Sequence, residues 1–549
     1  MPLGRPVGAL PKQLKFKGLP HMVKVLISDK LSPAAIEVFK VRGVEIDVKT
    51  GLNPAELREI IGQYDGLAIR SATKVTKEVL EAALNLKVVG RAGIGVDNVD
   101  VKSATSHGVV VMNTPHGNAI TTAEHAIAMM FALARQLPEA TASTKAGKWE
   151  KNRFMGVELT GKILGLIGCG NIGSIVADRA NGLKMKVLAY DPFLTEARAI
   201  ELGVEKADLE TVFAKADFIT LHTPLIEATR NIISREALAK MKKGVRIVNC
   251  ARGGLVDEEA LYDALKAGHV AGAALDVFEV EPATENKLFE LENVVCSPHL
   301  GASTSEAQEN VALQVAEQIS DFLLSGSVTN ALNMPSVSAE EAPRLRPYME
   351  LCRLLGTFAG QLTQAQDGSI QRILVEYEGA VAALNHRPLN AAALAGLLAP
   401  IMEGVNMVNA PALARDHGIE VSEASQDHTG DYHTLIRITV TTEKGARAVA
   451  GTLIGSGRPR LVEIKGIKVE AEFAPHMLYV TNKDKPGFIG RFGTTLADAG
   501  VNIATLHLGR SAEGRDAICL VSTDGETPED VLKTVRTLPL VTQATTLSF

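Results

Sequence analysis

The segment that most constrains the fold of this chain is GLIGCGNIG, residues 165–173. Gly168, Gly170 and Gly173 have the G-x-G-x-x-G spacing, and they follow a strand candidate, Lys162–Gly168, and open a helix. In a βαβ unit this spacing permits a tight turn, close approach of the backbone to a pyrophosphate and close packing of the helix on the strand. Glycine-rich turns also occur for packing alone, so the spacing by itself leaves both interpretations open.

A carboxylate in the next strand candidate favours the dinucleotide interpretation. The segment KVLAYDP, residues 186–192, places Asp191 near its end. Dinucleotide folds hold an acidic residue at about this separation from the glycines, where it accepts a hydrogen bond from the ribose 2′-hydroxyl. A carboxylate there would repel a 2′-phosphate, so we predict NAD rather than NADP as the cofactor.

Strand candidates alternate with helical segments through this half of the chain. They are Lys162–Gly168, Lys186–Pro192, Phe218–Pro224, Val245–Arg252, Val270–Phe278 and Val294–His299. The alternation predicts a doubly wound α/β sheet of six parallel strands, in which ligands bind beyond the carboxyl ends of the strands. In chain order, those ends present Gly168, Asp191, Thr223, Arg252, Asp276 and His299.

The polar residues at this edge suit hydride transfer between NAD and a 2-hydroxy or 2-oxo acid. A guanidinium such as that of Arg252 binds a carboxylate by two parallel hydrogen bonds. His299, in SPHLGAST, would exchange the hydroxyl proton, and Glu281 would stabilise its imidazolium form. Asp276 would fix the nicotinamide carboxamide, and Thr223 would contact the bound cofactor. A lone histidine at a strand end is more often structural, so the prediction depends on the whole set.

Further organisation is visible on both sides of this sheet. The segments 23–29, 44–48 and 66–71 alternate with helical segments and predict further βαβ units. A long apolar helix is predicted from Thr121, opened by a capping box of Thr121 and Glu124. The polar, proline-spaced segment 334–347 predicts a domain boundary, and residues 335–472 predict mixed α/β structure without evident chemistry.

The last part of the chain predicts a βαββαβ module, a pattern common in small regulatory domains. Its elements are Leu478–Thr481, Pro486–Ala499, Val501–Arg510, Ala517–Thr523, Thr527–Leu538 and Val541–Phe549.

Composition narrows the function classes. With 549 residues the chain is long enough for several domains, and 46% hydrophobic with 22% charged residues is typical of a globular protein. A formal net charge of -6 argues against a nucleic-acid partner, and no apolar run is long enough to predict a membrane span. Five scattered cysteines without metal spacing predict a reducing, cytoplasmic location and no metal site. Residues 1–21 are predicted to be an unstructured extension.

Eight segments together resemble the D-isomer-specific 2-hydroxyacid dehydrogenase family. They are RSATKV, VGRAGIGVDNVD, MNTPHGN, ATASTKAGKWEKNRFMGVEL, GLIGCGNIG, VNCARGGLVDE, GAALDVF with EP, and SPHLGAST. The resemblance covers residues 22–330 and implies that Arg252, Glu281 and His299 are catalytic. It implies cofactor contacts at Thr73, Gly168, Gly170, Asn171, Ile172, Gly173, Asp191, Thr223, Cys250, Ala251, Asp276, Gly301 and Ala302. It implies substrate contacts at Arg70, Ser71, Ile94, Gly95 and Asn118.

The same resemblance implies a nested architecture that closes over the substrate. Residues 22–119 and 303–332 would form a flavodoxin-like substrate-binding domain around a nucleotide-binding domain at 120–302. Residues 335–472 resemble the intervening domain, and residues 473–549 the ACT domain, of the long branch of the family. That branch oxidises 3-phosphoglycerate in the first step of L-serine biosynthesis, which makes 3-phosphoglycerate the expected substrate.

Regulation and assembly are also implied by the resemblance. L-serine is the expected effector, bound near Asn482, Asp484 and Asn502 between paired ACT modules, and the helix after Thr121 implies a homodimer or homotetramer. At the end of the intervening segment, Arg458, Arg460, Lys465 and Lys468 form either an anion site or a solvated charged strand pair.

Two alternative functions remain open at this stage. Within the family, the same three catalytic residues would serve a reductase of hydroxypyruvate, glyoxylate or 2-oxoglutarate. From another class, an NAD-sensing corepressor shares the catalytic core, but the terminal ACT pattern disfavours it.

Overall fold

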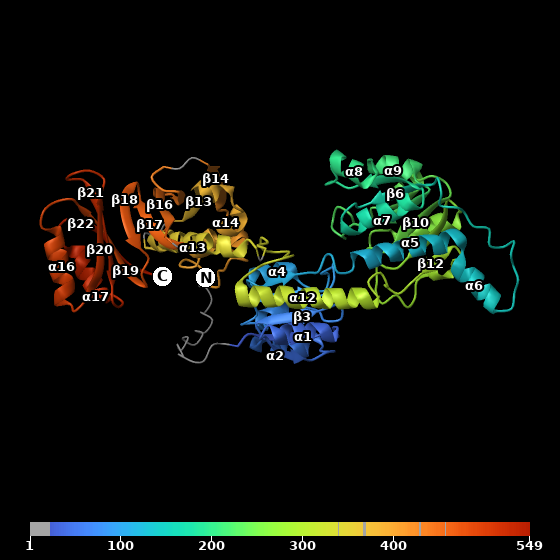
Figure 1. Cartoon of the computed structure of the whole chain (residues 1–549), viewed down its shortest axis with the longest axis horizontal. Helices are drawn as coiled ribbons and strands as arrows, with labels where there is room; N and C mark the ends of the chain where they lie inside the picture. The colour runs from blue at the N-terminus through green and yellow to red at the C-terminus, as the bar shows by residue number, and fades with distance from the viewer. Residues whose placement is uncertain (1–21, 339, 366–368, 428–429, 456) are drawn as a thin grey trace, which may run out of the picture.

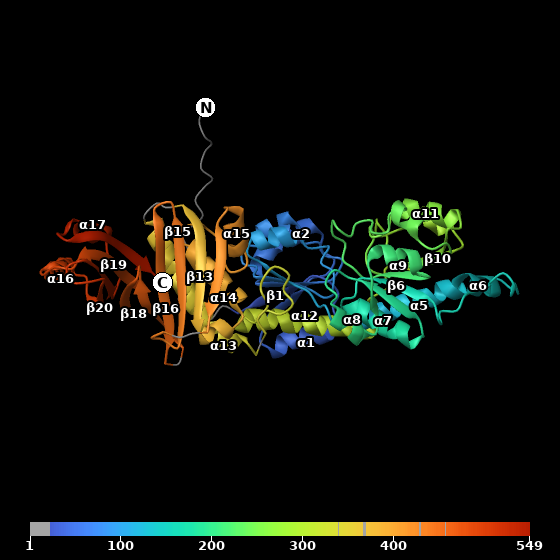
Figure 2. The ribbon, with the colours of Figure 1, turned by 90° about the horizontal axis from the view of Figure 1, so that it is seen from above.

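The computed structural model describes residues 22–338, 340–365, 369–427, 430–455 and 457–549, and the extension predicted at 1–21 lies outside them. Four β-sheets follow one another along the long axis of the molecule (Figures 1 and 2). The first sheet to appear in the chain lies between the second and third in space (Figure 2). In the described residues no helix is long and apolar enough to cross a membrane.

The first sheet is parallel and five-stranded, in the order β2-β1-β3-β4-β5. Its strands are β1 (Lys24–Ile27), β2 (Glu45–Val48), β3 (Gly66–Ile69), β4 (Val88–Arg91) and β5 (Val110–Met112). The helices after them are α1 (Pro33–Val41), α2 (Pro54–Ile60), α3 (Lys77–Ala82) and α4 (Val101–Ser106), with a 3-10 turn at Ile61–Gln63.

A helix from much later in the chain packs on this first sheet. α12 (Ser305–Ser325) places Val315 and Ile319 against β4, where a Cβ atom added at Gly90 would lie only 2.6 Å from Ile319. A glycine at position 90 therefore allows the close approach of α12 to the strand.

The second sheet is also parallel, with seven strands in the order β12-β11-β10-β9-β6-β7-β8. The strands are β6 (Ile163–Ile167), β7 (Lys186–Tyr190), β8 (Glu205–Lys206), β9 (Phe218–Leu221), β10 (Val245–Asn249), β11 (Val270–Leu275) and β12 (Val294–Cys296). The helices are α7 (Asn171–Gly182), α8 (Glu196–Leu202), α9 (Leu209–Lys215), α10 (Arg235–Lys240) and α11 (Glu258–Lys266), with a 3-10 turn at Lys287–Glu290. The six predicted parallel strands are confirmed, and the two-residue edge strand β8 was not predicted.

The long helix between the two sheets starts earlier than predicted. α5 (Ala119–Arg135) has Asn118 as its N-cap and makes no side-chain capping bond. The predicted capping box is wrong because Thr121 already lies in the first turn, where its hydroxyl is 3.4 Å from that of Thr304. The helix α6 (Leu137–Lys145) follows, and it leads into a segment that projects at the right edge of Figure 1.

The third sheet is mixed and six-stranded, in the order β14-β13-β15-β16-β17-β18. Its strands are β13 (Ile370–Gly379), β14 (Glu420–Gln426), β15 (Thr434–Thr442), β16 (Gly445–Ile454), β17 (Arg458–Ile464) and β18 (Ile467–Glu472). Its helices are α13 (Ala342–Gln364), α14 (His386–Leu398) and α15 (Ala410–Asp416), with a 3-10 turn at Ala380–Ala383. The segment 334–347, predicted as a polar boundary, already contains the first turns of α13, with Pro347 inside the helix.

The fourth sheet is antiparallel, in the order β20-β21-β19-β22, and confirms the predicted βαββαβ module. Its elements are β19 (His476–Lys483), α16 (Phe488–Asp498), β20 (Ile503–Arg510), β21 (Asp516–Thr523), α17 (Glu529–Thr537) and β22 (Val541–Ser548). Met477 and Tyr479 on β19 belong to the same buried apolar cluster as Phe358 on α13. The third and fourth sheets therefore share a core.

Candidate active site

The candidate active site lies along the carboxyl edge of the second sheet. All its strands are parallel, so the residues that follow them meet at one edge. From β12 to β7, these residues are His299, Asp276, Arg252, Thr223, Gly168 and Asp191. The topology therefore arranges six predicted site residues in one row.

The glycine turn after β6 has the geometry that a dinucleotide requires. Gly168 has a φ of +92°, and a Cβ atom at Gly173 would lie 2.1 Å from the Gly168 carbonyl oxygen. An added Cβ at Gly170, by contrast, would meet nothing within 4 Å, so the start of α7 is open to a ligand. Asn171 is exposed and Ile172 half-buried on the first turn of α7. These residues fit a bound pyrophosphate.

Asp191 stands beside this turn, where the ribose-binding carboxylate was predicted. One of its oxygens accepts a hydrogen bond from the Cys169 amide at 2.8 Å, and the other from the Phe193 amide at 2.8 Å. These bonds fix the carboxylate at the end of β7, next to the glycines. The arrangement fits recognition of a ribose without a 2′-phosphate.

A half-buried histidine, His222, packs against the turn and was not predicted. A Cβ atom at Gly168 would lie 2.4 Å from the His222 carbonyl oxygen, so the two backbones are in contact. The His222 ring is hydrogen-bonded through Nε2 to Thr220 at 2.9 Å. Burial lowers the pKa of His222 to about 4, so this ring is neutral at physiological pH. His222 therefore has a packing role under the turn.

His299 and Glu281, the predicted acid–base pair, are hydrogen-bonded to each other. His299 follows β12 with a φ of +56°, and its amide donates to the Asp276 carbonyl oxygen at 2.9 Å. Its Nδ1 lies 2.7 Å from Glu281 Oε2. Burial raises the pKa of Glu281, but the hydrogen bonds from His299 and from the Phe278 amide outweigh it and hold this pKa below its usual value. The carboxylate is therefore charged and orients the half-exposed imidazole.

Arg252 reaches from the second sheet to the loops of the first. Its loop is held by the Asn249 side chain, which donates to the Arg252 carbonyl oxygen at 2.8 Å. Arg252 Nε donates to Asp97 Oδ2 at 3.0 Å, and a Cβ atom at Gly95 would lie only 1.6 Å from Arg252 Nη2. Gly95, a predicted substrate contact, therefore leaves the space that this guanidinium occupies.

Two predicted cofactor contacts, Asp276 and Thr73, are hydrogen-bonded to other residues of the chain. Asp276 is fully buried, and its carboxylate accepts from Ser297 Oγ and from the amides of Leu300 and Gly301 at 2.6–2.8 Å. Its side chain therefore shapes the His299 loop, and its contact with a nicotinamide carboxamide stays a prediction. Thr73 is likewise buried and donates its amide and hydroxyl to Asp29.

The loop after β3 carries the predicted substrate contacts Arg70 and Ser71. Asp29, which is 5% exposed, accepts from the Arg70 amide at 2.6 Å, and Asn98 Nδ2 donates to the Arg70 carbonyl oxygen at 2.7 Å. Ser71 is exposed. The backbone of this loop is therefore fixed while the Arg70 side chain remains available for a ligand.

Arg91, at the end of β4, belongs to the same group of cations and was missed by the sequence analysis. Its Nε is buried and has no hydrogen-bond partner in the part of the chain that the structure describes. Burial lowers the pKa of Arg91 to about 10, and the positive charges of Arg252 and Arg70 contribute. The segment GRAG, in which a strand ends in a charged residue before a glycine, was a usable signal, because the predicted catalytic residues of the second sheet also follow their strands.

The remaining predicted contacts differ in accessibility. Asn113 Nδ2 donates to the Ile94 carbonyl oxygen at 2.6 Å, which fixes the loop before Gly95. Asn118 is 7% exposed, and its side-chain oxygen has no hydrogen-bond partner among the described residues. Thr223, Ala251 and Ala302 are half-buried at the sheet edge, whereas Cys250 is buried and burial raises the pKa of its thiol.

The three predicted effector residues do not meet within one chain. Asn482 pairs with Ala517 at the start of β21, while Asn502 lies beside Asp524 past its far end. At 3.3 Å a residue, about 20 Å of strand separates them. Asp484 accepts from Arg510 at 3.0 Å, and the buried Asn482 Oδ1 has no partner among the described residues. Within one chain, Asn502 therefore lies apart from Asn482 and Asp484.

Family models cover most of the chain. The NAD-binding domain of D-isomer-specific 2-hydroxyacid dehydrogenases matches residues 127–301. The D-3-phosphoglycerate dehydrogenase intervening domain matches residues 344–465, and the ACT domain matches residues 476–540.

Some known proteins align with nearly all of the chain, and others align with little more than half of it. A D-3-phosphoglycerate dehydrogenase of Synechocystis is 44% identical over 94% of this chain and 92% of its own length. One of Bacillus subtilis is 42% identical over 94% and 98% of the two chains. The structure of a glyoxylate reductase from Paecilomyes thermophila is 31% identical, with a TM-score of 0.54, and covers 57% of this chain and 99% of its own.

Proposed function

The chain belongs to the D-3-phosphoglycerate dehydrogenase family, within the D-isomer-specific 2-hydroxyacid dehydrogenases, and we propose that it oxidises D-3-phosphoglycerate to 3-phosphohydroxypyruvate. It uses NAD, and the reaction is the first step of L-serine biosynthesis. The glyoxylate reductase fold matches only about half of the chain, whereas the curated dehydrogenases match nearly all of it.

His299 is the base that takes the hydroxyl proton. Its Nδ1 is hydrogen-bonded to a charged carboxylate, so the neutral ring carries its proton there and leaves the Nε2 lone pair free. Nε2 accepts the proton of the substrate 2-hydroxyl on oxidation and returns it on reduction. Glu281 holds the ring in this tautomer and stabilises the imidazolium that forms.

Arg252 binds the substrate carboxylate beside this base. Its Nη1 donates to the Ala251 carbonyl oxygen at 2.6 Å and its Nε donates to Asp97, so the guanidinium plane is fixed between the two sheets. A fixed plane holds a 2-hydroxy acid in one orientation, with C2 in reach of the cofactor. Bound NAD supplies the hydride acceptor, so oxidation removes the C2 hydrogen as hydride and the hydroxyl hydrogen as a proton.

The observation that carries the choice of substrate is the group of three arginines. Arg252 suffices for one carboxylate, yet Arg70 and Arg91 stand close enough to influence each other electrostatically, and Arg91 Nε has no acceptor among the described residues. Three guanidiniums suit a substrate with an anionic group at each end. Glyoxylate and hydroxypyruvate have one such group, so the geometry favours a phosphorylated acid.

Steady-state kinetics of substitutions test the catalytic roles. We expect His299→Ala and Arg252→Ala each to lower turnover by about a hundredfold or more, because one removes the proton acceptor and the other the substrate anchor. NAD affinity, measured by calorimetry, should be retained in both. Turnover close to that of the wild type in either variant would contradict the assignment.

A comparison of substrates tests the phosphate subsite. We expect Arg70→Ala and Arg91→Gln to reduce kcat/KM for 3-phosphoglycerate by about tenfold or more, and for unphosphorylated D-glycerate by much less. Arg58→Ala, which removes an exposed arginine on α2, is the matched control. Equal losses on both substrates would favour the alternative of a reductase for small 2-oxo acids.

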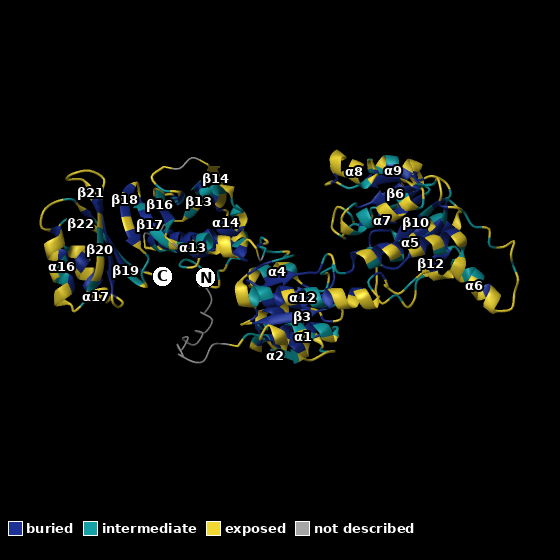
Figure 3. Cartoon of the chain, viewed as in Figure 1, coloured by how far each residue is buried: buried dark blue, intermediate teal, exposed yellow. Residues whose placement is uncertain are grey.

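Exposed apolar side chains around α5 and α6 support a homodimer or homotetramer. Leu137 is 51%, Trp149 87% and Met155 77% exposed. Figure 3 shows α6 and the segment after it as largely exposed. A second copy would bury these side chains. The five free cysteine thiols support a reducing, cytoplasmic location.

L-serine is the proposed effector of the ACT module. The buried Asn482 Oδ1 is an acceptor without a protein donor among the described residues, and Asp484 stands two residues further along the same strand end. Asn502 is about 20 Å away along β21, so it can join them only from a second module. This separation supports a site between paired modules. Calorimetry with L-serine on the wild type and on Asn482→Ala tests it.

A further inference from the structure

A histidine on α5 faces the carboxyl edge of the second sheet, where the candidate active site lies. His125 Nε2 lies 3.2 Å from Asp276 Oδ1 and 3.3 Å from Ser297 Oγ. The His125 side chain is 21% exposed, while that of Asp276 is fully buried. His125 takes no part in the proposed proton transfer, which uses His299. Its contact with Asp276 nevertheless connects it to the loop that carries this base.

The Asp276 carboxylate accepts hydrogen bonds at both of its oxygens. Oδ1 accepts from Ser297 Oγ at 2.6 Å and from the Leu300 amide at 2.7 Å, and Oδ2 accepts from the Gly301 amide at 2.8 Å. Burial raises the pKa of Asp276, but its hydrogen bonds, with that from His125 first among them, outweigh burial and the net shift is downward. A buried carboxylate is costly unless a cation pairs with it, and His125 is its one ion-pair partner among the described residues.

The loop that carries His299 is held by the same aspartate. The His299 amide donates to the Asp276 carbonyl oxygen at 2.9 Å. The next two amides of the chain, those of Leu300 and Gly301, donate to its carboxylate. His299 has a φ of +56°, a left-handed conformation that a residue other than glycine keeps only where its surroundings impose it. The orientation of the His299 ring therefore depends on the bonds to Asp276.

One face of α5 covers this loop. Thr122, His125 and Met129 are spaced three and four residues apart, so their side chains lie on the same side of the helix. Thr122 Oγ1 lies 2.9 Å from the Gly301 carbonyl oxygen, and Met129 Sδ lies 3.7 Å from Ser297 Oγ. His125 stands between these two contacts and supplies the ring N–H that reaches the aspartate.

We propose that His125 is a positioning residue for the base His299. It donates from Nε2 to the Asp276 carboxylate and keeps that carboxylate charged. A charged acceptor binds the amides of Leu300 and Gly301 more strongly than a neutral carboxyl would, so the loop holds the base in one orientation. His125 itself does not touch the reacting atoms. This role rests on the proposed function, in which His299 takes the hydroxyl proton.

The rate of hydride transfer tests the role. We expect His125→Leu to slow NADH formation from 3-phosphoglycerate, followed by stopped flow at saturating substrate, by about tenfold, because the base is misplaced. KM for 3-phosphoglycerate should stay within about twofold, since Arg70 and Arg252 lie on other loops. His125→Gln should recover most of the rate, because its side-chain amide can donate near the position of Nε2. A wild-type rate in His125→Leu, or equal losses in both variants, would overturn the proposal.

Hydrogen–deuterium exchange measures the loop without any substrate. In the full-length protein, the peptide that covers residues 297–303 should take up deuterium faster in His125→Leu than in the wild type, and His125→Gln should resemble the wild type. Unchanged uptake in His125→Leu would also overturn the proposal. Because this measurement needs no turnover, a wild type that fails to oxidise 3-phosphoglycerate would contradict the proposed function alone.

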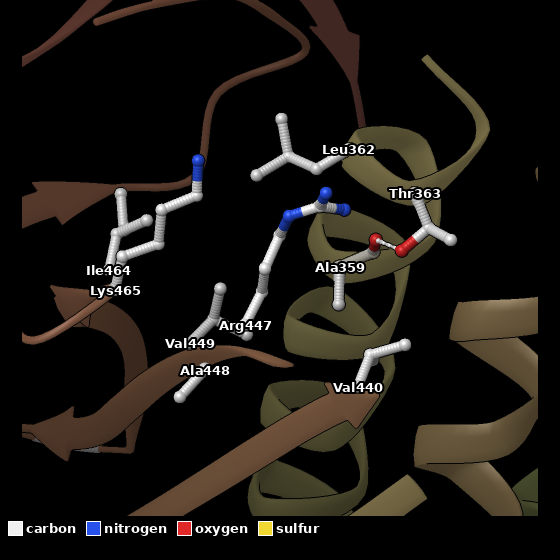
Figure 4. A pocket seen from close by; sticks show the side chains of 9 residues that line it. All are labelled: Ala359, Leu362, Thr363, Val440, Arg447, Ala448, Val449, Ile464 and Lys465. Atoms are coloured by element: carbon white, nitrogen blue, oxygen red, sulfur yellow. Dashed lines mark hydrogen bonds between the residues drawn. The ribbon is translucent and has the colours of Figure 1, made fainter. Parts of the chain in front are cut away.

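Two variants control for a general loss of stability. His269→Leu removes a half-buried histidine at the opposite end of β11, where Nε2 lies 2.9 Å from a backbone carbonyl oxygen. Thr363→Val removes a buried hydroxyl from the pocket between α13 and the third sheet, where it donates to the Ala359 carbonyl oxygen at 2.8 Å (Figure 4). Each should lower Tm without changing hydride transfer or the exchange of the His299 loop. A loss in either control as large as that in His125→Leu would overturn the proposal.

Discussion

At the scale of single residues, the pairing of His299 with Glu281 has a consequence for pH dependence. Glutamine in place of Glu281 keeps a hydrogen bond to Nδ1 but removes the charge that stabilises the imidazolium. We expect Glu281→Gln to move the acid limb of the pH profile of kcat/KM to lower pH and to reduce the maximal rate. Glu279→Gln, at the exposed neighbour, should leave the profile unchanged. A pH profile identical to that of the wild type would mean that Glu281 has only a structural role.

Asp191 gives a second prediction at this scale, on cofactor choice. Its carboxylate is held by the Cys169 and Phe193 amides beside the glycine turn. Asp191→Ala should weaken the binding of NAD and improve the binding of NADP, because the substitution removes both the ribose contact and the repulsion of a 2′-phosphate. The ratio of kcat/KM for the two cofactors measures this change. An unaltered ratio would mean that Asp191 does not face the ribose.

At the scale of elements, one carboxylate joins the amino ends of two central strands. Asp217, just before β9, accepts from the Ile163 amide at the start of β6 at 2.9 Å, and Lys242 binds it at 2.6 Å. Burial raises the pKa of Asp217, but these two bonds outweigh it and the net shift is downward. Because the folded-state pKa lies below the unfolded one, Asp217 stabilises the fold at neutral pH, and this stability is lost as the pH falls below about 4.

Asp217→Asn should therefore lower the free energy of unfolding by about 1–3 kcal/mol at pH 7. The difference from the wild type should shrink between pH 4 and pH 3, as the wild-type carboxylate becomes protonated. Denaturant unfolding of the second sheet at both pH values measures the effect. Asp178→Asn, at an exposed position on α7, serves as the control. A difference that is constant with pH would contradict the assigned role.

The elements also show why the sequence predicts some features and not others. The buried strands β6, β7 and β9 to β12 are continuous apolar runs between glycine or polar turns, so the pattern alone identifies them. β8 has two exposed residues, Glu205 and Lys206, and no local signal distinguishes it from a turn. The start of α5 was misplaced because Thr121 and Glu124 have the spacing of a cap, while Asn118 is the actual N-cap.

The candidate site likewise contains residues that the sequence pattern identifies and residues that it does not. Residues that end strands of one sheet, such as Arg252 and His299, were predictable, because parallel strands bring their carboxyl ends together. Arg91 ends a strand of the other sheet, and only the placement of the first sheet beside the second brings it near Arg252. The Asp276 carboxylate accepts hydrogen bonds from the loop that carries His299. The path of this loop determines those bonds, and no spacing in the sequence specifies that path.

At the scale of the whole molecule, two groups of contacts on the first sheet come from the segments that follow α12. Asn333 Oδ1 accepts from the Val111 amide on β5, and its Nδ2 donates to Thr105 and to the Val109 carbonyl oxygen. From the intervening domain, Val408 is buried in the core of the first sheet, and Asn406 Nδ2 donates to the Gly108 carbonyl oxygen at 2.9 Å. The first contact lies before the domain boundary and the second after it.

This arrangement predicts the behaviour of a chain that ends at Ser338. Such a chain keeps the contacts of Asn333 and the bridge between Val328 and Val337. It also keeps every proposed catalytic group, so its turnover without effector should stay within a few-fold of the full-length value. It loses Val408 and Asn406 from the first sheet, and we expect a lower Tm for that reason. Because the ACT module is removed, L-serine should neither bind nor inhibit, whereas the full-length protein should be inhibited by a coupling of about 1–3 kcal/mol. Kinetics and calorimetry with L-serine on both chains, below the Tm of the shorter one, measure the coupling. Inhibition of the truncated chain would locate the effector site in the catalytic half instead.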